Sequence, residues 1–232
     1  MHYYRYYNKI KRVESNIRKY VYEIFKVYGN ELLLRLEDYN LLSDENNCIE
    51  SSTATGFIIE EFITSKLKIY SQNHFFPENK VYKLNRSNIS TTNSSYDCYS
   101  WDENLFVMIN IKAEKNTSQN NGVAAINILY DDYVVKNPEI EKAYLVLKIN
   151  YHFGYSEFDG QRKIFIDDVY SYFLEELDFS EEHRQDHRNW STTFNKNSGR
   201  LLISNFFIKT HQLEKNLISY ENTRKMLEKL VK

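Results

Sequence analysis

Apolar residues recur at every third or fourth position in the first 28 residues, which is the spacing of one face of an α-helix. Gly29 follows this stretch and can end a helix. The pattern predicts a helix over residues 8–28 and a second, short helix over 30–42. The apolar positions of the first helix are Ile10, Val13, Ile17, Val21, Ile24 and Val27.

A second amphipathic stretch covers residues 55–70 and predicts another helix. The Ser-Ser-Thr segment at 51–53 supplies side chains that can cap its first turn. The stretch from 71 to 95 is rich in Asn, Ser and Thr, which predicts a loop with one short strand around Val81–Leu84.

The most informative pattern is a β-hairpin. Residues 96–101 form a short extended run, and Asp-Glu-Asn at 102–104 is a turn signal. Residues 105–113 are strongly apolar and β-branched, as expected of a buried strand.

The rest of the chain alternates between helical, extended and irregular patterns. In chain order we predict a helix at 122–135, a buried strand at 143–153, a turn at 156–161, a strand at 163–167, a polar irregular segment at 180–200 and a long C-terminal helix at 204–231. This order predicts one α/β or α+β domain over residues 1–232. Its parts are an N-terminal helical region for dimerisation (1–50), a core (55–170) and a C-terminal region (180–232).

Composition and charge narrow the functional classes. The chain has 232 residues, with 30 Lys and Arg against 32 Asp and Glu, which excludes a strongly basic protein of the histone type. A local basic groove can still bind nucleic acid on such a chain. With only 6 Gly and 2 Pro, glycine-rich phosphate loops and turn-dense all-β folds are disfavoured.

Two cysteines, Cys48 and Cys98, are too few for a disulfide framework or a cysteine-rich zinc site. No apolar run approaches the ~20 residues that span a bilayer. The N-terminus, Met-His-Tyr-Tyr, lacks the apolar region of a signal peptide. We therefore expect a soluble, cytoplasmic protein with no membrane partner.

Polar residues interrupt the most apolar strand of the chain. Successive strand residues face opposite sides, so Asn110, Lys112 and Glu114 share one face. Asp97 stands at the start of the other strand of the hairpin. A buried lysine is costly without a partner. Oxygen ligands beside a lysine can bind a hard cation such as Mg²⁺, so the hairpin is a candidate metal site.

This arrangement resembles a known nuclease signature. Asp97 followed by Asn110-Ile111-Lys112 resembles the PD-(D/E)xK motif, Asp-x(n)-Asp/Glu-x-Lys. The interval is similar to that of the blunt-cutting type II restriction endonucleases of the HincII, SwaI and EcoRV group. The segment TGFIIEEFI at 55–63 resembles the helix before the hairpin in that group. The strands at 144–151 and 163–167 resemble the sheet strands that follow.

The resemblance implies a restriction-endonuclease-like fold, with a mixed central sheet flanked by helices and a long C-terminal helix. It further implies a homodimer in the bacterial cytoplasm that cuts double-stranded DNA at a short palindrome. Water would attack the phosphodiester with Mg²⁺ as cofactor and Mn²⁺ as a substitute, leaving 5′-phosphates and blunt ends. A cognate DNA methyltransferase of the host would be a functional partner and not a physical one.

The resemblance also implies roles for individual residues. Asp97 would be the central metal ligand, with the side chain of Asn110 and the carbonyl of Ile111 beside it. Lys112 would position the attacking water and stabilise charge on the phosphate.

The helix would add Glu60, or alternatively Glu61, to hold a water or a second metal. One departure concerns Asn110, because the family usually has Asp or Glu there and a neutral amide brings no negative charge. Glu114, on the same strand face, could supply the missing carboxylate.

DNA contacts are expected from two polar segments. The first follows the strand, and the second lies within residues 183–200, although a plain solvated loop is the alternative for both. The candidate residues are Lys115, Gln119, Asn120, Asn121, Arg184, Arg188, Asn189, Asn195, Lys196, Asn197 and Arg200.

Two rival hypotheses follow from the same residues. Asn110 favours a DNA-binding protein that has a nuclease fold and a degenerate metal site. The second rival is a nuclease of the same fold that recognises DNA structure and not DNA sequence.

Overall fold

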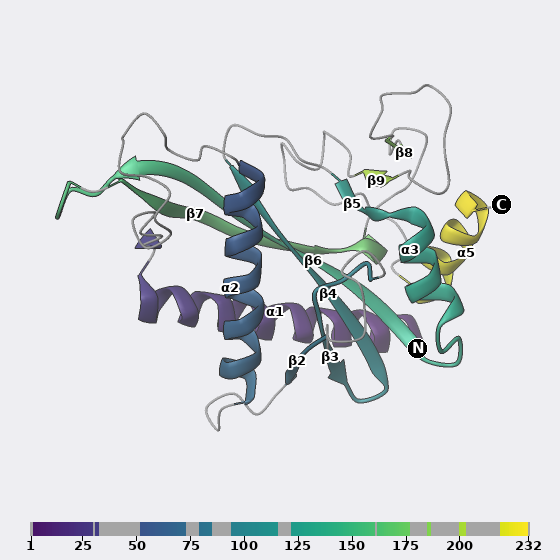
Figure 1. The fold of residues 1–232 in the computed structure, drawn as a ribbon. Coiled ribbons are helices and arrows are strands. Elements are labelled where there is room, and N and C mark those ends of the chain that lie inside the picture. The colour runs from purple at the N-terminus through teal and green to yellow at the C-terminus, as the bar shows by residue number, and fades with distance from the viewer. Residues whose placement is uncertain are drawn as a thin grey trace.

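A six-stranded mixed sheet organises the molecule, which we describe from a computed structural model (Figure 1). The structure describes residues 2–29, 31–32, 52–72, 79–84, 94–115, 122–160, 162–176, 185–186, 200–202 and 219–231. The strand order is β1-β7-β6-β4-β3-β2, in which β4 and β6 are parallel and the other neighbours antiparallel. The strands are β1 (Glu31–Leu32), β2 (Val81–Lys83), β3 (Cys98–Asp102), β4 (Leu105–Lys115), β6 (Glu141–Tyr155) and β7 (Arg162–Phe173).

Two long helices cover one face of this sheet (Figure 1). Helix α1 (His2–Tyr28) buries the predicted apolar stripe from Ile10 to Ile24, whereas Val27 in its last turn is exposed. Gly29 follows the helix with a positive φ of 77°. Helix α2 (Ser52–Gln72) packs beside it. The odd-numbered residues of β4, such as Ile109 and Ile111, point into this layer.

Shorter elements cover part of the opposite face, where the even-numbered residues of β4, such as Met108, are buried. They are α3 (Ile126–Tyr130), the π-helix η4 (Asp131–Val135), the 3₁₀ turn η5 (Leu174–Glu176) and α5 (Tyr220–Val231). A second sheet of order β5-β9-β8 lies beside them, formed by Gly122–Ala125, Arg200–Leu202 and Gln185–Asp186. None of the described helices is both long and apolar enough to cross a membrane.

The predicted mixed sheet, its flanking helices and the hairpin are confirmed, whereas two helix predictions are wrong in part. Residues 122–125 form β5, because they pair with β9, a partner that lies far along the chain and leaves no local signal. Glu31 and Leu32 form β1 against β7 and not the start of a helix. The C-terminal helix is described from Tyr220, and residues 203–218 of its predicted span lie outside the described residues.

The carboxyl group of Glu175 satisfies a backbone amide of β6 just beyond the end of β7. The pairing of β6 with β7 starts at Leu145, and the amide of the preceding Tyr144 donates to both oxygens of Glu175, at 3.0 and 3.2 Å. The Tyr133 hydroxyl donates to the same carboxyl at 2.6 Å. Burial raises the pKa of Glu175 to about 8, although these hydrogen bonds oppose the shift.

Candidate active site

The candidate site lies at the start of β3, where β4 extends beyond its partner strand. The Asp97 amide donates to the carbonyl of Ile109 at 2.9 Å, just before β3 begins at Cys98. Strand β4 runs on to Lys115, so the amides of Ile111 and Ala113 face an edge that β3 does not reach. Buried or partly buried amides need acceptors, and here side chains supply them.

Two carboxylates accept these two amides. Asp97 Oδ2 lies 2.8 Å from the Ile111 nitrogen, and Glu60 Oε1 lies 3.1 Å from the Ala113 nitrogen. Asp97 comes from the entry to β3 and Glu60 from α2. The two residues are therefore brought to successive outward amides of one strand.

Helix α2 delivers Glu60 because it runs close to β4. At Gly56, one turn earlier, a Cβ would stand 3.5 Å from the carbonyl oxygen of Ala113. The neighbouring Glu61 points elsewhere and pairs with Lys83 of β2 at 2.8 Å. The structure thus places Glu60, and not Glu61, beside Asp97.

Electrostatic interactions connect Glu60 with Lys112. Burial raises the pKa of Glu60 above its ordinary value, and the charges of Asp97 and Glu61 add to this rise. The positive charge of Lys112 and the amide of Ala113 act in the opposite direction. Two carboxylates and a lysine therefore share one electrostatic environment.

The raised pKa predicts that Glu60→Gln stabilises the protein when no cation is bound. Burial and the like charge of Asp97 disfavour the ionised form of Glu60, whereas glutamine keeps the acceptor for Ala113 without the charge. We expect the Tm to rise by about 2–4 °C, the shift that about 1 kcal/mol produces in a chain of this size. Thermal unfolding in EDTA measures it, with Glu61→Gln as the matched control. Glu61→Gln removes the charge that pairs with Lys83 and should lower the Tm. A lower Tm for Glu60→Gln as well would contradict the prediction.

Asn110 lies on the other face of β4 and is 2% exposed. Its amide nitrogen donates to the Tyr144 hydroxyl at 2.7 Å and to the Val123 carbonyl at 2.9 Å. The side-chain oxygen is therefore the atom of Asn110 that could serve a cation. These bonds also tie β5 to β4.

Glu114, a candidate metal ligand from the sequence, forms an ion pair with Lys148 of β6. Its Oε2 lies 2.8 Å from Nζ of Lys148, and both side chains are buried. Burial lowers the pKa of Lys148, and the charge of Lys112, its neighbour across the parallel strands, adds to this effect. The structure thus places a second lysine beside Lys112, with Glu114 as its counter-ion.

The donor set suits a hard divalent cation. The N–H and C=O groups of one strand residue point to the same side, so the Ile111 carbonyl faces the edge that Asp97 and Glu60 occupy. Among the described residues no three His, Cys, Asp or Glu side chains gather closely enough to hold a metal. Mg²⁺ commonly takes one or two carboxylates and completes its shell with water and substrate phosphate, so two carboxylates and a carbonyl fit it.

The predicted DNA-contact residues lie mostly outside the described residues. Lys115 is described, and its Nζ lies 5.5 Å from the centre of the Phe153 ring at the end of β4. The backbone of Arg200 belongs to β9, between β5 and β8. The small sheet thus joins the chain that follows Lys115 to both ends of the 187–199 segment. The predicted residues that are not described are Gln119, Asn120, Asn121, Arg184, Arg188, Asn189, Asn195, Lys196 and Asn197.

Some residues that support this site were not predicted from sequence, namely Ser95, Asp132, Tyr144 and Lys148. Asp132 carried a readable signal, because it follows Leu129 at a spacing of three and directly precedes Tyr133. That helical spacing places its carboxylate on a buried face.

The described fold and site define a mixed α/β protein with two carboxylates and a lysine at an open strand edge. No protein-family model matches the chain, and no curated protein matches it. Among solved structures, the chain is similar to the NlaIV restriction endonuclease at 10% identity and a TM-score of 0.35, covering 77% of this chain and 74% of that chain. This similarity is too weak to assign the chain to a family.

Proposed function

We propose that this protein is a nuclease that hydrolyses phosphodiester bonds of double-stranded DNA, and more specifically a type II restriction endonuclease. One observation carries the proposal. Asp97 and Glu60 accept hydrogen bonds from the amides of Ile111 and Ala113, and the positive charge of Lys112 between these two residues favours the ionised form of Glu60. Acidic residues beside a lysine at a strand edge suit the binding of a cation and a phosphate.

In the proposed reaction, water attacks the phosphorus in line with the bond to the 3′ oxygen. The water releases one proton to solvent and its hydroxyl stays on phosphorus. The bond to the 3′ oxygen breaks, and that oxygen takes up a proton from solvent. The products are a 5′-phosphate and a 3′-hydroxyl. Lys112 orients the attacking water and donates to the phosphate oxygen on which charge develops.

Mg²⁺, or Mn²⁺ in its place, would be held by Asp97, Glu60 and the Ile111 carbonyl, and would supply positive charge to the scissile phosphate. Asp97 and Glu60 accept hydrogen bonds from two amides of β4, and these bonds orient both carboxylates. The side-chain oxygen of Asn110 would add a neutral oxygen ligand from the other face of β4.

The finer features are proposed from the resemblance of the sequence. They are a homodimer acting on a short palindrome, blunt ends as in the HincII, SwaI and EcoRV group, a bacterial cytoplasmic location and a cognate methyltransferase. The small sheet supports a DNA-reading role, because the two polar segments predicted to contact DNA both join it. The hydrogen bond from Asn110 to the Val123 carbonyl links this sheet to the strand that carries the candidate site.

Cleavage of a large mixed-sequence DNA tests the proposal. The purified protein is incubated with the DNA in Mg²⁺, in Mn²⁺ and in EDTA, and the products are separated on a gel. We expect discrete bands in both metals and intact DNA in EDTA, and end-mapping then gives the site and the stagger. Intact DNA in both metals would overturn the proposal.

A DNA-binding protein with a degenerate metal site is the second candidate, and Asn110 favours it. If Asn110 is a degenerate metal ligand that has replaced an acidic residue, Asn110→Asp should restore cleavage. We expect the opposite, because an aspartate cannot donate to the Val123 carbonyl and would be buried beside it. Leaving such a buried group unsatisfied costs about 1–3 kcal/mol of stability.

Urea unfolding and cleavage assays of Asn110→Asp decide between the candidates. Asn222→Asp, which adds the same charge at an exposed position of α5, controls for charge alone. A variant of Asn110 that is stable and cuts faster than the natural protein would support the degenerate site.

A further inference from the structure

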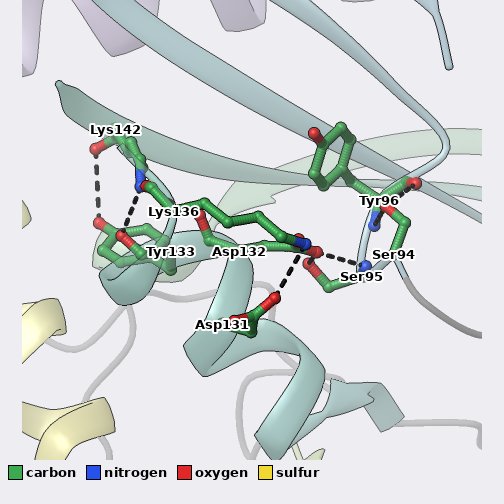
Figure 2. Close-up of polar contacts among 8 residues, drawn as sticks. All are labelled: Ser94, Ser95, Tyr96, Asp131, Asp132, Tyr133, Lys136 and Lys142. Atoms are coloured by element: carbon green, nitrogen blue, oxygen red, sulfur yellow. Dashed lines mark hydrogen bonds and ion pairs between the residues drawn. The ribbon is translucent and has the colours of Figure 1, made fainter. Parts of the chain in front are cut away.

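The segment that leads into β3 is anchored two residues before Asp97. Ser95 is buried and donates twice to Oδ2 of Asp132, from its amide at 2.7 Å and from its hydroxyl at 2.8 Å (Figure 2). Asp132 is 5% exposed and belongs to η4. A buried carboxylate thus ties the π-helix to the entry of the candidate site.

Asp132 is itself held firmly. Lys136 contacts its Oδ1 at 2.7 Å and also contacts Asp131 at 2.9 Å (Figure 2). The buried Lys142 of β6 donates to the carbonyls of Asp132 and Tyr133 at 3.0 Å each, and to that of Lys136. These bonds satisfy carbonyls at the end of η4 and fix it to the central sheet.

A second connection runs from Ser95 to β4. The Tyr144 hydroxyl donates to the Ser95 carbonyl and accepts a hydrogen bond from Asn110 at 2.7 Å. Ser95 is therefore bound on both its donor and its acceptor side. Two residues further on, the Asp97 amide donates a hydrogen bond to the Ile109 carbonyl, and the Asp97 carboxylate accepts one from the Ile111 amide.

We infer that Asp132 is a positioning residue that holds Asp97 in place through Ser95. The inference rests on the proposed function, because it assigns Asp132 to the same site. Groups that orient a metal ligand typically change metal affinity by about 10–100-fold when they are removed. Asp132 contacts no reacting group and acts on the site through the chain.

The test combines two measurements on Asp132→Ala. Residue-resolved amide exchange is measured without metal or DNA, and Mn²⁺ affinity is measured by titration calorimetry. We expect the Ile111 amide, whose acceptor is Asp97, to exchange about tenfold faster or more, with Ala113 little changed, since its acceptor is Glu60. Mn²⁺ affinity should fall by about 10–100-fold.

Matched variants separate positioning from general stability. Asp131→Ala removes the other partner of Lys136, is half-exposed and has no contact with Ser95, so it should change neither measurement. Asp132→Asn keeps an oxygen for Ser95 and should recover most of the loss. Ser95→Ala removes one donor and should give a smaller change in the same direction. It also keeps the test open if Asp132→Ala does not fold.

The outcomes for the inference and for the proposed function differ. Equal acceleration of Ile111 and Ala113, or no change at Ile111, would overturn the positioning role even if the natural protein cuts DNA. Selective acceleration of Ile111 in a protein that neither binds Mn²⁺ nor cuts DNA would support the positioning of Asp97 and overturn the nuclease proposal.

Discussion

Replacing Lys112 by alanine is expected to lower the rate of DNA cleavage by about 10²–10³-fold, the usual cost of removing one donor to developing charge. Lys112 stands on β4 between the residues whose outward amides meet Asp97 and Glu60. The positive charge of Lys112 favours the ionised form of Glu60 and so opposes the rise in its pKa. Its loss removes the group proposed to orient water and to stabilise the phosphate, while the carboxylates remain.

Single-turnover cleavage in Mg²⁺ measures this effect, and fluorescence anisotropy in Ca²⁺ measures DNA binding separately. We expect affinity to change far less than rate, because phosphates along the whole interface contribute to binding. Lys229→Ala removes an exposed lysine of α5 and should leave both unchanged. Cleavage by Lys112→Ala at the natural rate would remove the lysine from the proposed mechanism.

A second large effect concerns the pH dependence of stability. Glu175 has its pKa raised to about 8 from an ordinary 4.5. Between these values the folded protein keeps a proton that the unfolded chain has lost, so stability falls as pH rises. The favourable contribution is complete below about pH 4.5 and lost by about pH 8, at a rate of at most about 1.4 kcal/mol per pH unit.

Glu175→Gln removes this titration. The free energy of unfolding of the variant, relative to the natural protein, should therefore increase steadily from pH 5 to pH 8. Urea unfolding at several pH values measures the difference, and Glu139→Gln, at an exposed position, should show no such trend. A constant difference between Glu175→Gln and the natural protein across this range would show that Glu175 does not keep its proton.

Local patterns account for what could be predicted of the fold. The hairpin of β3 and β4 depends on a turn and on strand residues that are adjacent in sequence, so its signal is complete within residues 96–113. The stripe on α1 is equally local. By contrast, β5 is a strand because of β9, and the helical appearance of residues 122–125 carries no information about that partner.

The candidate site divides in the same way. Asp97 and Lys112 belong to one hairpin, so their proximity follows from its geometry. The meeting of Glu60 with Ala113 depends on how closely α2 approaches β4 at Gly56, which no periodicity specifies. The partner of Glu114 could not be predicted either, because Lys148 reaches it through the parallel pairing of β4 with β6.

The position of β7 has a consequence for biosynthesis. This strand pairs with β1, through Glu31 and Phe165, and it also packs against α1. The apolar stripe of α1 therefore lacks part of its cover until residues 162–173 have left the ribosome. Such long-range closure slows folding and exposes nascent chains to aggregation.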